Sequence, residues 1–287
     1  MVATEKPKAS VADIRKWLET KPHYPQTIPD DLLLIFLHSC YYIEAKTIRA
    51  IEAYFRIRSS TPEFFNNRCI VNSDMITISE NIKTFALPGR TKEGYVVISS
   101  MLSTDDYSRF SLENAVKLLF MVIDLCLKEQ TPPIPGFLFT FNMTDMCFGH
   151  LTKISISTVR KYFNYIQEAM PVRLKGIHIV HVNSVMSHVM SLIRPFTYKE
   201  HMNQIHLYRT SEIDKMYDHI PLEMLPKDQG GNSPTSETLF NETLEKLKSL
   251  EPYFDEDEAT LRIDESKREP SETNNGFMKS IFGRWAS

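Results

Sequence analysis

Glycine is scarce in this sequence, and the short patterns that mark several kinds of active site are absent. Only nine of the 287 residues are glycine, and no P-loop, G-x-G-x-x-G, G-x-S-x-G or H-E-x-x-H pattern occurs. These patterns serve nucleotide binding, nucleophilic catalysis and zinc-dependent hydrolysis. Their absence favours a binding protein over an enzyme, and we expect no catalytic residues and no cofactor.

Cysteine is also infrequent, and its spacing is uninformative. The sequence has four cysteines, and none of them forms a C-x-x-C pair. The common zinc-site spacings are therefore missing, and we expect no metal site. The first residues, MVATEKPKAS, lack the apolar core of a secretory signal. The simplest interpretation is a cytoplasmic protein with reduced thiols, and a secreted protein with disulfides is the less favoured alternative.

No apolar run is long enough to cross a bilayer. A spanning helix needs roughly 18 or more apolar residues, and residues 115–127, the nearest candidate, are interrupted by Lys117 and Asp124. Hydrophobic residues still make up 42% of the chain, which is enough for a sizeable core. Any membrane association is therefore expected to be peripheral and transient.

Basic charge does not dominate the composition. The chain has 33 Lys and Arg against 36 Asp and Glu, a net charge of −3, which argues against a nucleic-acid partner. The charge is uneven. Residues 251–272 hold nine acidic and three basic residues, a net of −6, so the rest of the chain carries about +3.

Amphipathic patterns near the N-terminus predict three helices, at about residues 11–20, 30–40 and 43–57. Ser10 is placed to cap the first helix. Acidic residues at the start of the second helix favour it through the helix dipole. We assign residues 1–70 to a small helical region that packs on the main domain.

Strand and helix patterns alternate through the middle of the chain. Short β-branched or aromatic runs predict strands at residues 94–99, 136–142 and 176–182. Longer apolar patterns predict helices at residues 112–128 and 155–170. The alternation is typical of an α/β domain with a mostly parallel sheet, which we place at residues 71–231.

Two surfaces of this domain could face one apolar ligand. Phe137, Phe139 and Phe141 share one face of their strand. A helix predicted at residues 183–193 has an apolar face with two methionines, which give a soft surface typical of adaptable binding sites. Its other face carries Ser184, Ser187, His188 and Ser191. Ordinary core packing remains the alternative for both surfaces.

The remaining features have plain interpretations. His178 and His181 fall on opposite faces of their strand and are poor co-ligands, and His178 is expected to be a hydrogen-bonded core histidine. We expect residues 232–287 to form a polar, acidic tail with one helix, at 237–250, followed by extended or disordered chain at 251–275. The amphipathic segment 276–285 could touch a membrane or dock on the protein.

Several short motifs stand together in residues 167–208. They are Gln167, Pro171-Val172-Arg173, Lys175-Gly176-Ile177-His178, Arg194-Pro195-Phe196 and Ile205-His206. Gly149-His150-Leu151 precedes them, and Leu225-Pro226 with Gly230-Gly231 follows. With this spacing, residues 11–231 resemble the CRAL-TRIO family of lipid-transfer proteins, most closely its alpha-tocopherol transfer protein-like branch.

The resemblance implies a small N-terminal helical bundle followed by an α/β domain whose sheet floors a lipid pocket under a mobile gate helix. The residues that would line or border the pocket are Phe137, Phe139, Phe141, Phe148, Ile154, Ile166, Met170, Leu174, Ile177 and Ile179. The residues that would form the gate are Val185, Met186, Val189, Met190, Ile193 and Phe196.

The resemblance also implies a basic rim that binds phosphoinositide head groups, such as phosphatidylinositol bisphosphate, or other anionic lipid. Its residues would be Arg173, Lys175, Arg194 and Lys199. The sequence departs from the branch here, because Glu200 and Gln204 stand where relatives have basic residues. The arginine-rich stretch of the family's N-terminal bundle is replaced by IFLHSC at residues 35–40.

Two functions follow from these observations. The first is an intracellular carrier that holds one tocopherol-, retinoid- or phospholipid-like molecule in a gated pocket and transfers it between membranes. Such a carrier is expected to be a monomer whose partners are the ligand and a transient membrane surface. The alternative is a protein-interaction module with a vestigial pocket.

Overall fold

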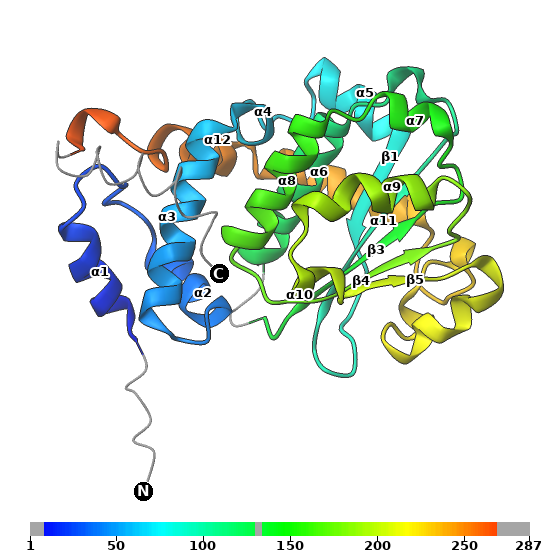
Figure 1. The fold of residues 1–287 in the computed structure, drawn as a ribbon, viewed down its shortest axis with the longest axis horizontal. Coiled ribbons are helices and arrows are strands. Elements are labelled where there is room, and N and C mark those ends of the chain that lie inside the picture. The colour runs from blue at the N-terminus through cyan, green and yellow to red at the C-terminus, as the bar shows by residue number, and fades with distance from the viewer. Residues whose placement is uncertain (1–8, 130–133, 269–287) are drawn as a thin grey trace, which may run out of the picture.

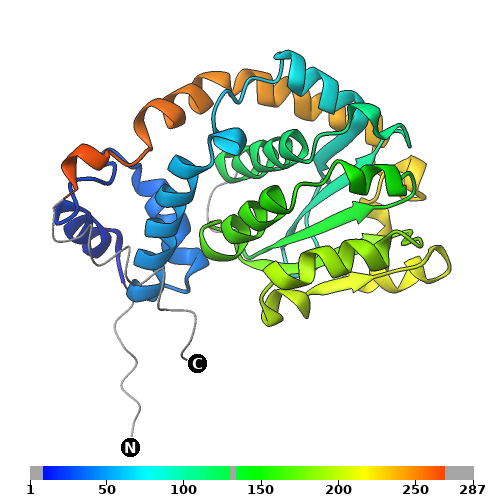
Figure 2. The same ribbon diagram turned by 45° about the horizontal axis from the view of Figure 1, so that its top comes forward.

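The computed structural model describes residues 9–129 and 134–268. A group of N-terminal helices lies beside an α/β domain, and the C-terminal helices run back from the α/β domain to the N-terminal group (Figure 1, Figure 2). The predicted fold class, a helical N-terminal region followed by an α/β domain, is confirmed.

The N-terminal region contains the three predicted helices: α1 (Val11–Glu19), α2 (Asp30–Ser39) and α3 (Glu44–Ser60). Ser10 caps α1 as expected, because the Asp13 N–H donates to the Ser10 hydroxyl at 3.3 Å and the Ser10 N–H donates to the Asp13 carboxylate at 2.9 Å. Two further helices, α4 (Pro62–Phe65) and α5 (Ser73–Asn81), lie in a region where the sequence predicts only a connection.

Five strands form one sheet in the order of the chain: β1 (Ile82–Ala86), β2 (Val96–Leu102), β3 (Phe137–Asn142), β4 (Leu174–Val180) and β5 (Ile205–Leu207). β1 is antiparallel to β2, and the other neighbours are parallel. The mostly parallel sheet is therefore confirmed, and β1 is an addition that the sequence patterns do not predict.

The sequential strand order determines where the connecting helices lie. Connections between parallel strands are almost always right-handed, so steps in one direction place their helices on the same face. These helices are α6 (Leu112–Glu129), α8 (Ile156–Glu168) and α9 (Met186–Ile193). In Figure 1, α8 and α9 lie in front of the sheet.

Short elements complete the connections. They are η1 (Tyr107–Arg109), α7 (Phe148–Thr152), η2 (Arg194–Phe196), α10 (Lys199–Met202), η3 (Thr210–Asp218), η4 (Leu222–Met224) and η5 (Lys227–Gln229).

The C-terminal region is more ordered than its composition predicts. α11 (Ser236–Ser249) packs against β1, and Lys83 of β1 pairs with Glu237 of α11 at 2.9 Å. α12 (Glu251–Thr260) and η6 (Glu265–Lys267) follow. The expectation of extended chain from residue 251 was therefore wrong over α12, and the described part of the tail, up to residue 268, has two α-helices rather than one. The amphipathic segment 276–285 lies outside the described residues.

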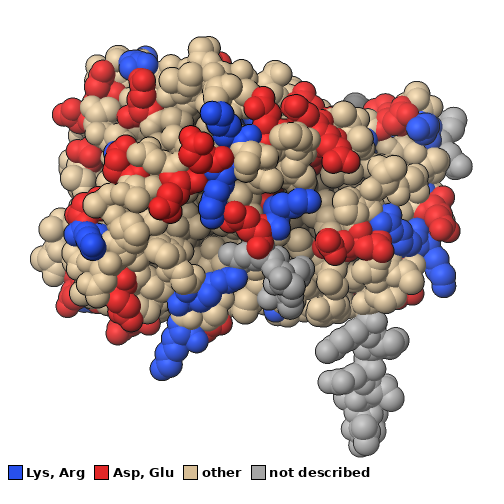
Figure 3. Space-filling view, turned by 180° about the vertical axis from the view of Figure 1, so that it is seen from behind, with Lys and Arg blue, Asp and Glu red and all other residues tan. Residues whose placement is uncertain are grey.

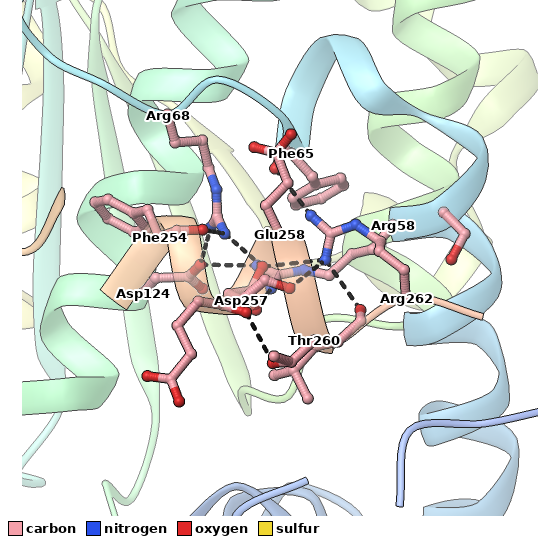
Figure 4. Close-up of polar contacts among 12 residues, drawn as sticks. Arg58, Phe65, Arg68, Asp124, Phe254, Asp257, Glu258, Thr260 and Arg262 are labelled. Carbon is pink, nitrogen blue, oxygen red and sulfur yellow. Dashed lines mark hydrogen bonds and ion pairs between the residues drawn. The ribbon is translucent and has the colours of Figure 1, made fainter. Parts of the chain in front are cut away.

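A buried network of charges explains why α12 is held in place (Figure 4). Arg58 of α3 pairs with Asp257 of α12 and with Asp124 of α6, each at 2.7 Å. Arg68 pairs with the same two carboxylates, at 2.8 Å for Asp124. Burial alone would raise the pKa of Asp257, but the nearby Arg58 and Arg68 outweigh burial and lower it. Three separate parts of the chain therefore meet in one charge-balanced cluster.

The surface opposite the view of Figure 1 carries both signs of charge. Lysine and arginine side chains alternate with aspartate and glutamate side chains over this face, with no broad area of one sign (Figure 3). Such a surface lacks the basic stripe that a nucleic acid would need on this side.

Candidate ligand-binding site

A cavity of about 250 Å³ lies between the sheet and helices α6, α8 and α9. The sheet supplies mainly aliphatic side chains and Phe141, α6 supplies Leu119, and α8 supplies Tyr162 and Phe163. No charged side chain of the described residues lines this cavity. A smaller neighbouring cavity, which we call its extension, shares part of the same lining and lies between β3, β4 and the end of α8. The volume is just below the range of about 300 to 1,000 Å³ that is usual for small-molecule sites.

The structure brings together most of the residues that the resemblance assigns to the pocket. Phe141, Ile154, Ile166, Ile177 and Ile179 line the cavity, and Phe139, Met170 and Leu174 line its extension. These side chains come from one face of β3 and β4 and from α8 and the loop before it, as the strand alternation predicts.

Two residues of the predicted pocket lie elsewhere. Phe137 is buried at the start of β3 and does not line the cavity. Phe139, two residues further along the same strand face, lines only the extension, so Phe137 lies beyond the end of the cavity. Phe148 is 52% exposed on α7, where its ring contacts the His188 ring of α9 at 5.1 Å. Phe148 therefore borders the gate helix on the surface rather than lining the cavity.

α9 covers the cavity with a narrower face than the sequence predicts. Val189 and Ile193 line the cavity, together with Leu192, which the sequence interpretation omitted. Met186 and Met190 instead line a second hollow on the other side of the helix, beside Leu207. The apolar stripe is wide enough to serve both surfaces, and only the packed structure shows which residue faces which.

The other two gate residues lie at the ends of α9. Val185 is buried at the helix start, and Phe196 is half-buried in η2. The polar face is exposed as predicted, at Ser184, Ser187, His188 and Ser191. Within α9 itself, Met186 is the one residue classed as buried. A helix with so little buried surface is held to the protein by few contacts.

One amide side chain fastens each end of α9. At the start, the Asn183 amide donates to the Met143 and Met146 carbonyls, at 3.3 and 2.8 Å. At the end, the Gln167 amide donates to the Phe196 carbonyl at 2.9 Å, and the Tyr198 N–H donates to the Gln167 carbonyl at 2.6 Å. Gln167 is one of the motif residues in the sequence, and its contacts give it a structural role.

The predicted basic rim is broken up in the structure. Arg173 donates to the His38 carbonyl, at 2.9 Å from its Nε, and its guanidinium lies 4.0 Å from the Tyr41 ring centroid. The Lys175 ammonium lies 5.7 Å from the Tyr95 ring centroid. Burial lowers the pKa of His38, and the nearby Arg173 and Lys175 lower it further. Arg173, the residue before β4, thus joins this part of the sheet to the end of α2.

The outer part of the rim is more open. Arg194, Lys199 and Glu200 are exposed on η2 and α10. Gln204 is half-buried, and its amide donates to the Leu174 carbonyl at 3.3 Å. In the described part of the chain, none of the four predicted rim cations forms an ion pair with a carboxylate.

The opposite face of the sheet carries a group of histidines. His178 is buried as predicted, and its Nδ1 lies 3.0 Å from the Tyr208 hydroxyl. The rings of His206 and His219 each lie 5.0 Å from the His178 ring. Burial, and then the nearby His206 and His219, lower the pKa of His178 to about 3. Over residues 9–129 and 134–268, no group of three potential ligand side chains is placed to hold a metal ion.

Comparison with known families identifies the class of protein. A family model described as "CRAL/TRIO domain" matches residues 80–231, which is more than half of the chain. The protein therefore belongs to the CRAL/TRIO family. A second model, described as "Pinta-like, UBA domain", matches residues 3–75, so the N-terminal helices are similar to that domain. No helix in the described ranges has the length and apolarity needed to span a membrane.

The individual relatives are distant. The chain is 19% identical to an "Alpha-tocopherol transfer protein-like" protein of Homo sapiens over 244 residues, covering 82% of this chain and 69% of that protein. It is 20% identical to "Clavesin-1" of Xenopus laevis over 225 residues, covering 78% of this chain and 68% of that protein. A solved structure titled "Crystal structure of Sfh5" matches at 12% identity with a TM-score of 0.48, covering 74% of each chain.

Proposed function

We propose that this protein binds one small hydrophobic molecule in the cavity and exchanges it with membranes. The observation that carries the proposal is an apolar cavity, without charged lining residues, under a thinly packed amphipathic helix. Membership of the CRAL/TRIO family supports it. Tocopherol-, retinoid- and phospholipid-like molecules are all candidates for the ligand.

Hydrophobic burial provides enough free energy for such binding. Removing about 400 Å² of ligand surface from water contributes roughly 10 kcal/mol at about 25 cal/mol per Å², before the cost of ordering the ligand. Covalent attachment is therefore unnecessary for retention.

Release requires α9 to move, and a bilayer makes that movement favourable. In water, opening would expose Val189, Leu192 and Ile193, whereas at a membrane these side chains would contact lipid. Exposed apolar residues stand nearby. Ile156 is 61% exposed, two residues from the cavity-lining Ile154, and Phe148 contacts α9. We assign this side of the molecule to membrane contact.

Arg194 and Lys199 would strengthen that contact with anionic lipid. An exposed cation near an anionic surface contributes about 1 kcal/mol. Arg173 is already engaged with the N-terminal region and Lys175 lies near the Tyr95 ring, so any phosphoinositide binding at the rim is expected to be weak. Comparing binding to vesicles with and without phosphatidylinositol bisphosphate, at equal total charge, tests this part of the proposal.

A matched pair of α9 variants tests the carrier function. Val189→Asp places a charge against the cavity, and Ser191→Asp places the same charge on the exposed face of the same helix. We expect Val189→Asp to abolish retention of a bound fluorescent lipid and its transfer between donor and acceptor vesicles. With vesicles of uncharged lipid, Ser191→Asp should leave both within about twofold of the original protein, because surface substitutions have small effects.

Native mass spectrometry of the unmodified protein gives an independent test. One lipid bound per chain is expected, and extraction would identify it. A folded protein that stays empty and takes up no lipid from vesicles would contradict the carrier function and favour the protein-interaction module.

A further inference from the structure

One hydroxyl group at the cavity has no hydrogen-bond partner in the part of the chain that the structure describes. Tyr162 lies on α8 and lines both the main cavity and its extension. Its ring stacks on Phe120, with centroids 5.9 Å apart and planes at 15°, and meets Phe163 edge-on at 5.1 Å. These contacts fix the ring. Among the described residues, no group forms a hydrogen bond with its hydroxyl.

The hydroxyl lies deep in the protein and still has open space beside it. Burial raises the pKa of Tyr162 well above its usual range, and no other group contributes to the shift. The phenol therefore keeps its proton and remains a hydrogen-bond donor at physiological pH. The side chain is nevertheless only half-buried, and its oxygen keeps accessible surface. We therefore place the Tyr162 hydroxyl at the wall of the cavity, where a bound ligand could reach it.

Each of the other polar side chains in the described lining already forms at least one hydrogen bond within the protein. The Thr84 and Ser100 hydroxyls lie 3.0 Å apart and bond with each other. The Asn142 side-chain carbonyl accepts from the Thr144 N–H at 2.9 Å. Among the polar side chains of the described lining, Tyr162 is therefore the one with no hydrogen bond to the protein, and its hydroxyl is left for a ligand.

These groups limit the chemistry of the ligand. An ionised carboxylate or phosphate inside the cavity would have no counter-charge, and burying it would be very costly. A pure hydrocarbon would leave the phenol unsatisfied, which also costs binding free energy. An uncharged molecule with one acceptor oxygen avoids both costs.

We propose that the Tyr162 hydroxyl selects the ligand, and that the ligand is an uncharged amphiphile with a hydroxyl or carbonyl oxygen at the end that reaches α8. Its hydrocarbon part lies against the aliphatic side chains of α9. This inference rests on the proposed carrier function and specifies the chemical class of its cargo.

The substitution Tyr162→Phe tests the inference because it removes the hydroxyl and keeps the ring. Dodecanol and dodecane, each titrated against a bound anilinonaphthalene reporter, supply a matched pair of probes. Tyr162→Phe should weaken dodecanol binding roughly 3- to 10-fold, the value of one hydrogen bond, and change dodecane binding less than about twofold. Dodecanoate should bind the original protein more weakly than dodecanol at pH 8.

Tyr217→Phe is the matched control. It removes the hydroxyl of a half-buried tyrosine of η3 outside the cavity lining, and should change neither affinity. Equal effects of Tyr162→Phe on dodecanol and dodecane would overturn the inference while leaving the carrier function intact. So would a loss of thermal stability in the ligand-free variant, because it would show that the hydroxyl has a partner in the protein. If the original protein displaces the reporter with none of the probes, the carrier function itself is contradicted.

Discussion

His178 shows how one buried residue ties the stability of this protein to pH. The residue sits on the side of the sheet away from the cavity, against Tyr208, His206 and His219. Its pKa falls from the usual 6.5 to about 3 because burial disfavours the charged ring and the two neighbouring histidines add to the effect. The folded protein therefore holds this ring neutral at a pH where an unfolded chain would protonate it.

The resulting pH dependence has a definite sign. Because the pKa is lower in the folded state, the stabilisation is complete above pH 6.5 and is lost as the pH falls from 6.5 toward about 3. The loss reaches up to about 1.4 kcal/mol per pH unit. Urea unfolding between pH 7.5 and about pH 5.5, which lies above the ordinary pKa of Asp and Glu side chains, should show this slope in the original protein and a flatter slope in His178→Gln. Parallel slopes for the two proteins would contradict the assignment.

Residue types in the cavity were more predictable than residue roles. Strand alternation is local, so Phe139 and Phe141 could be placed on one face from the sequence alone. The lack of a hydrogen-bond partner for the Tyr162 hydroxyl among the described residues could not be predicted, because it depends on which side chains of α6 and the sheet lie next to it. The same holds for Arg173, whose contact with His38 joins residues 135 positions apart.

At the scale of single elements, α9 combines a weakly packed body with firm ends. Asn183 ties its start to the loop after β3, and Gln167 ties its end to α8. The helix body contributes little buried surface. Such an arrangement lets the middle of the helix lift while its ends return it to the same position.

Loosening one end of α9 should therefore speed ligand exchange. Asn183→Ala removes two hydrogen bonds to backbone carbonyls outside the helix and a third, at 3.0 Å, from the Val185 N–H at the helix start. The two bonds to the carbonyls hold the helix to the rest of the protein, and at about 1 kcal/mol each their loss should raise the dissociation rate of a fluorescent lipid by roughly 5- to 30-fold. Stopped-flow transfer to excess vesicles measures that rate. Asn203→Ala, at an exposed position near the other end of the gate, is the control and should leave it unchanged. An equal rate in Asn183→Ala would show that opening does not involve this end.

Elements with a strong local pattern were predicted, and elements that depend on distant partners were missed. α1, α2 and α3 each have an apolar stripe, and α6 is apolar on most sides. α12 has no such stripe, and its acidic composition resembles that of disordered chain. Its helix is stabilised instead by Arg58 and Arg68, which come from the far end of the sequence. α5 and β1 fall in a stretch whose pattern was too short to interpret.

At the scale of the whole molecule, the chain closes on itself through Asp257. α12 places this carboxylate between Arg58 and Arg68, and Arg262 adds a further contact at 3.1 Å. Figure 2 shows the C-terminal helices spanning from the α/β domain to the N-terminal helices. The charge cluster therefore sets how the helical region sits beside the cavity-bearing domain, and the C-terminal helices act as a structural part of the fold.

Removing the Asp257 carboxylate should release α12 and weaken the packing of the N-terminal helices beside the α/β domain. Asp257→Ala leaves two fully buried arginines with one remaining partner, Asp124. Breaking a buried ion pair in this way costs about 3 to 5 kcal/mol, a large share of a typical stability of about 5 to 15 kcal/mol. Urea denaturation should show that loss, and limited proteolysis should cut between the N-terminal helices and the sheet.

Asp255→Ala is the matched control. It removes an exposed carboxylate from the same helix, and its free energy of unfolding should stay within about 0.5 kcal/mol of that of the original protein. Similar stabilities for the two variants would mean that packing, rather than charge, holds α12 in place.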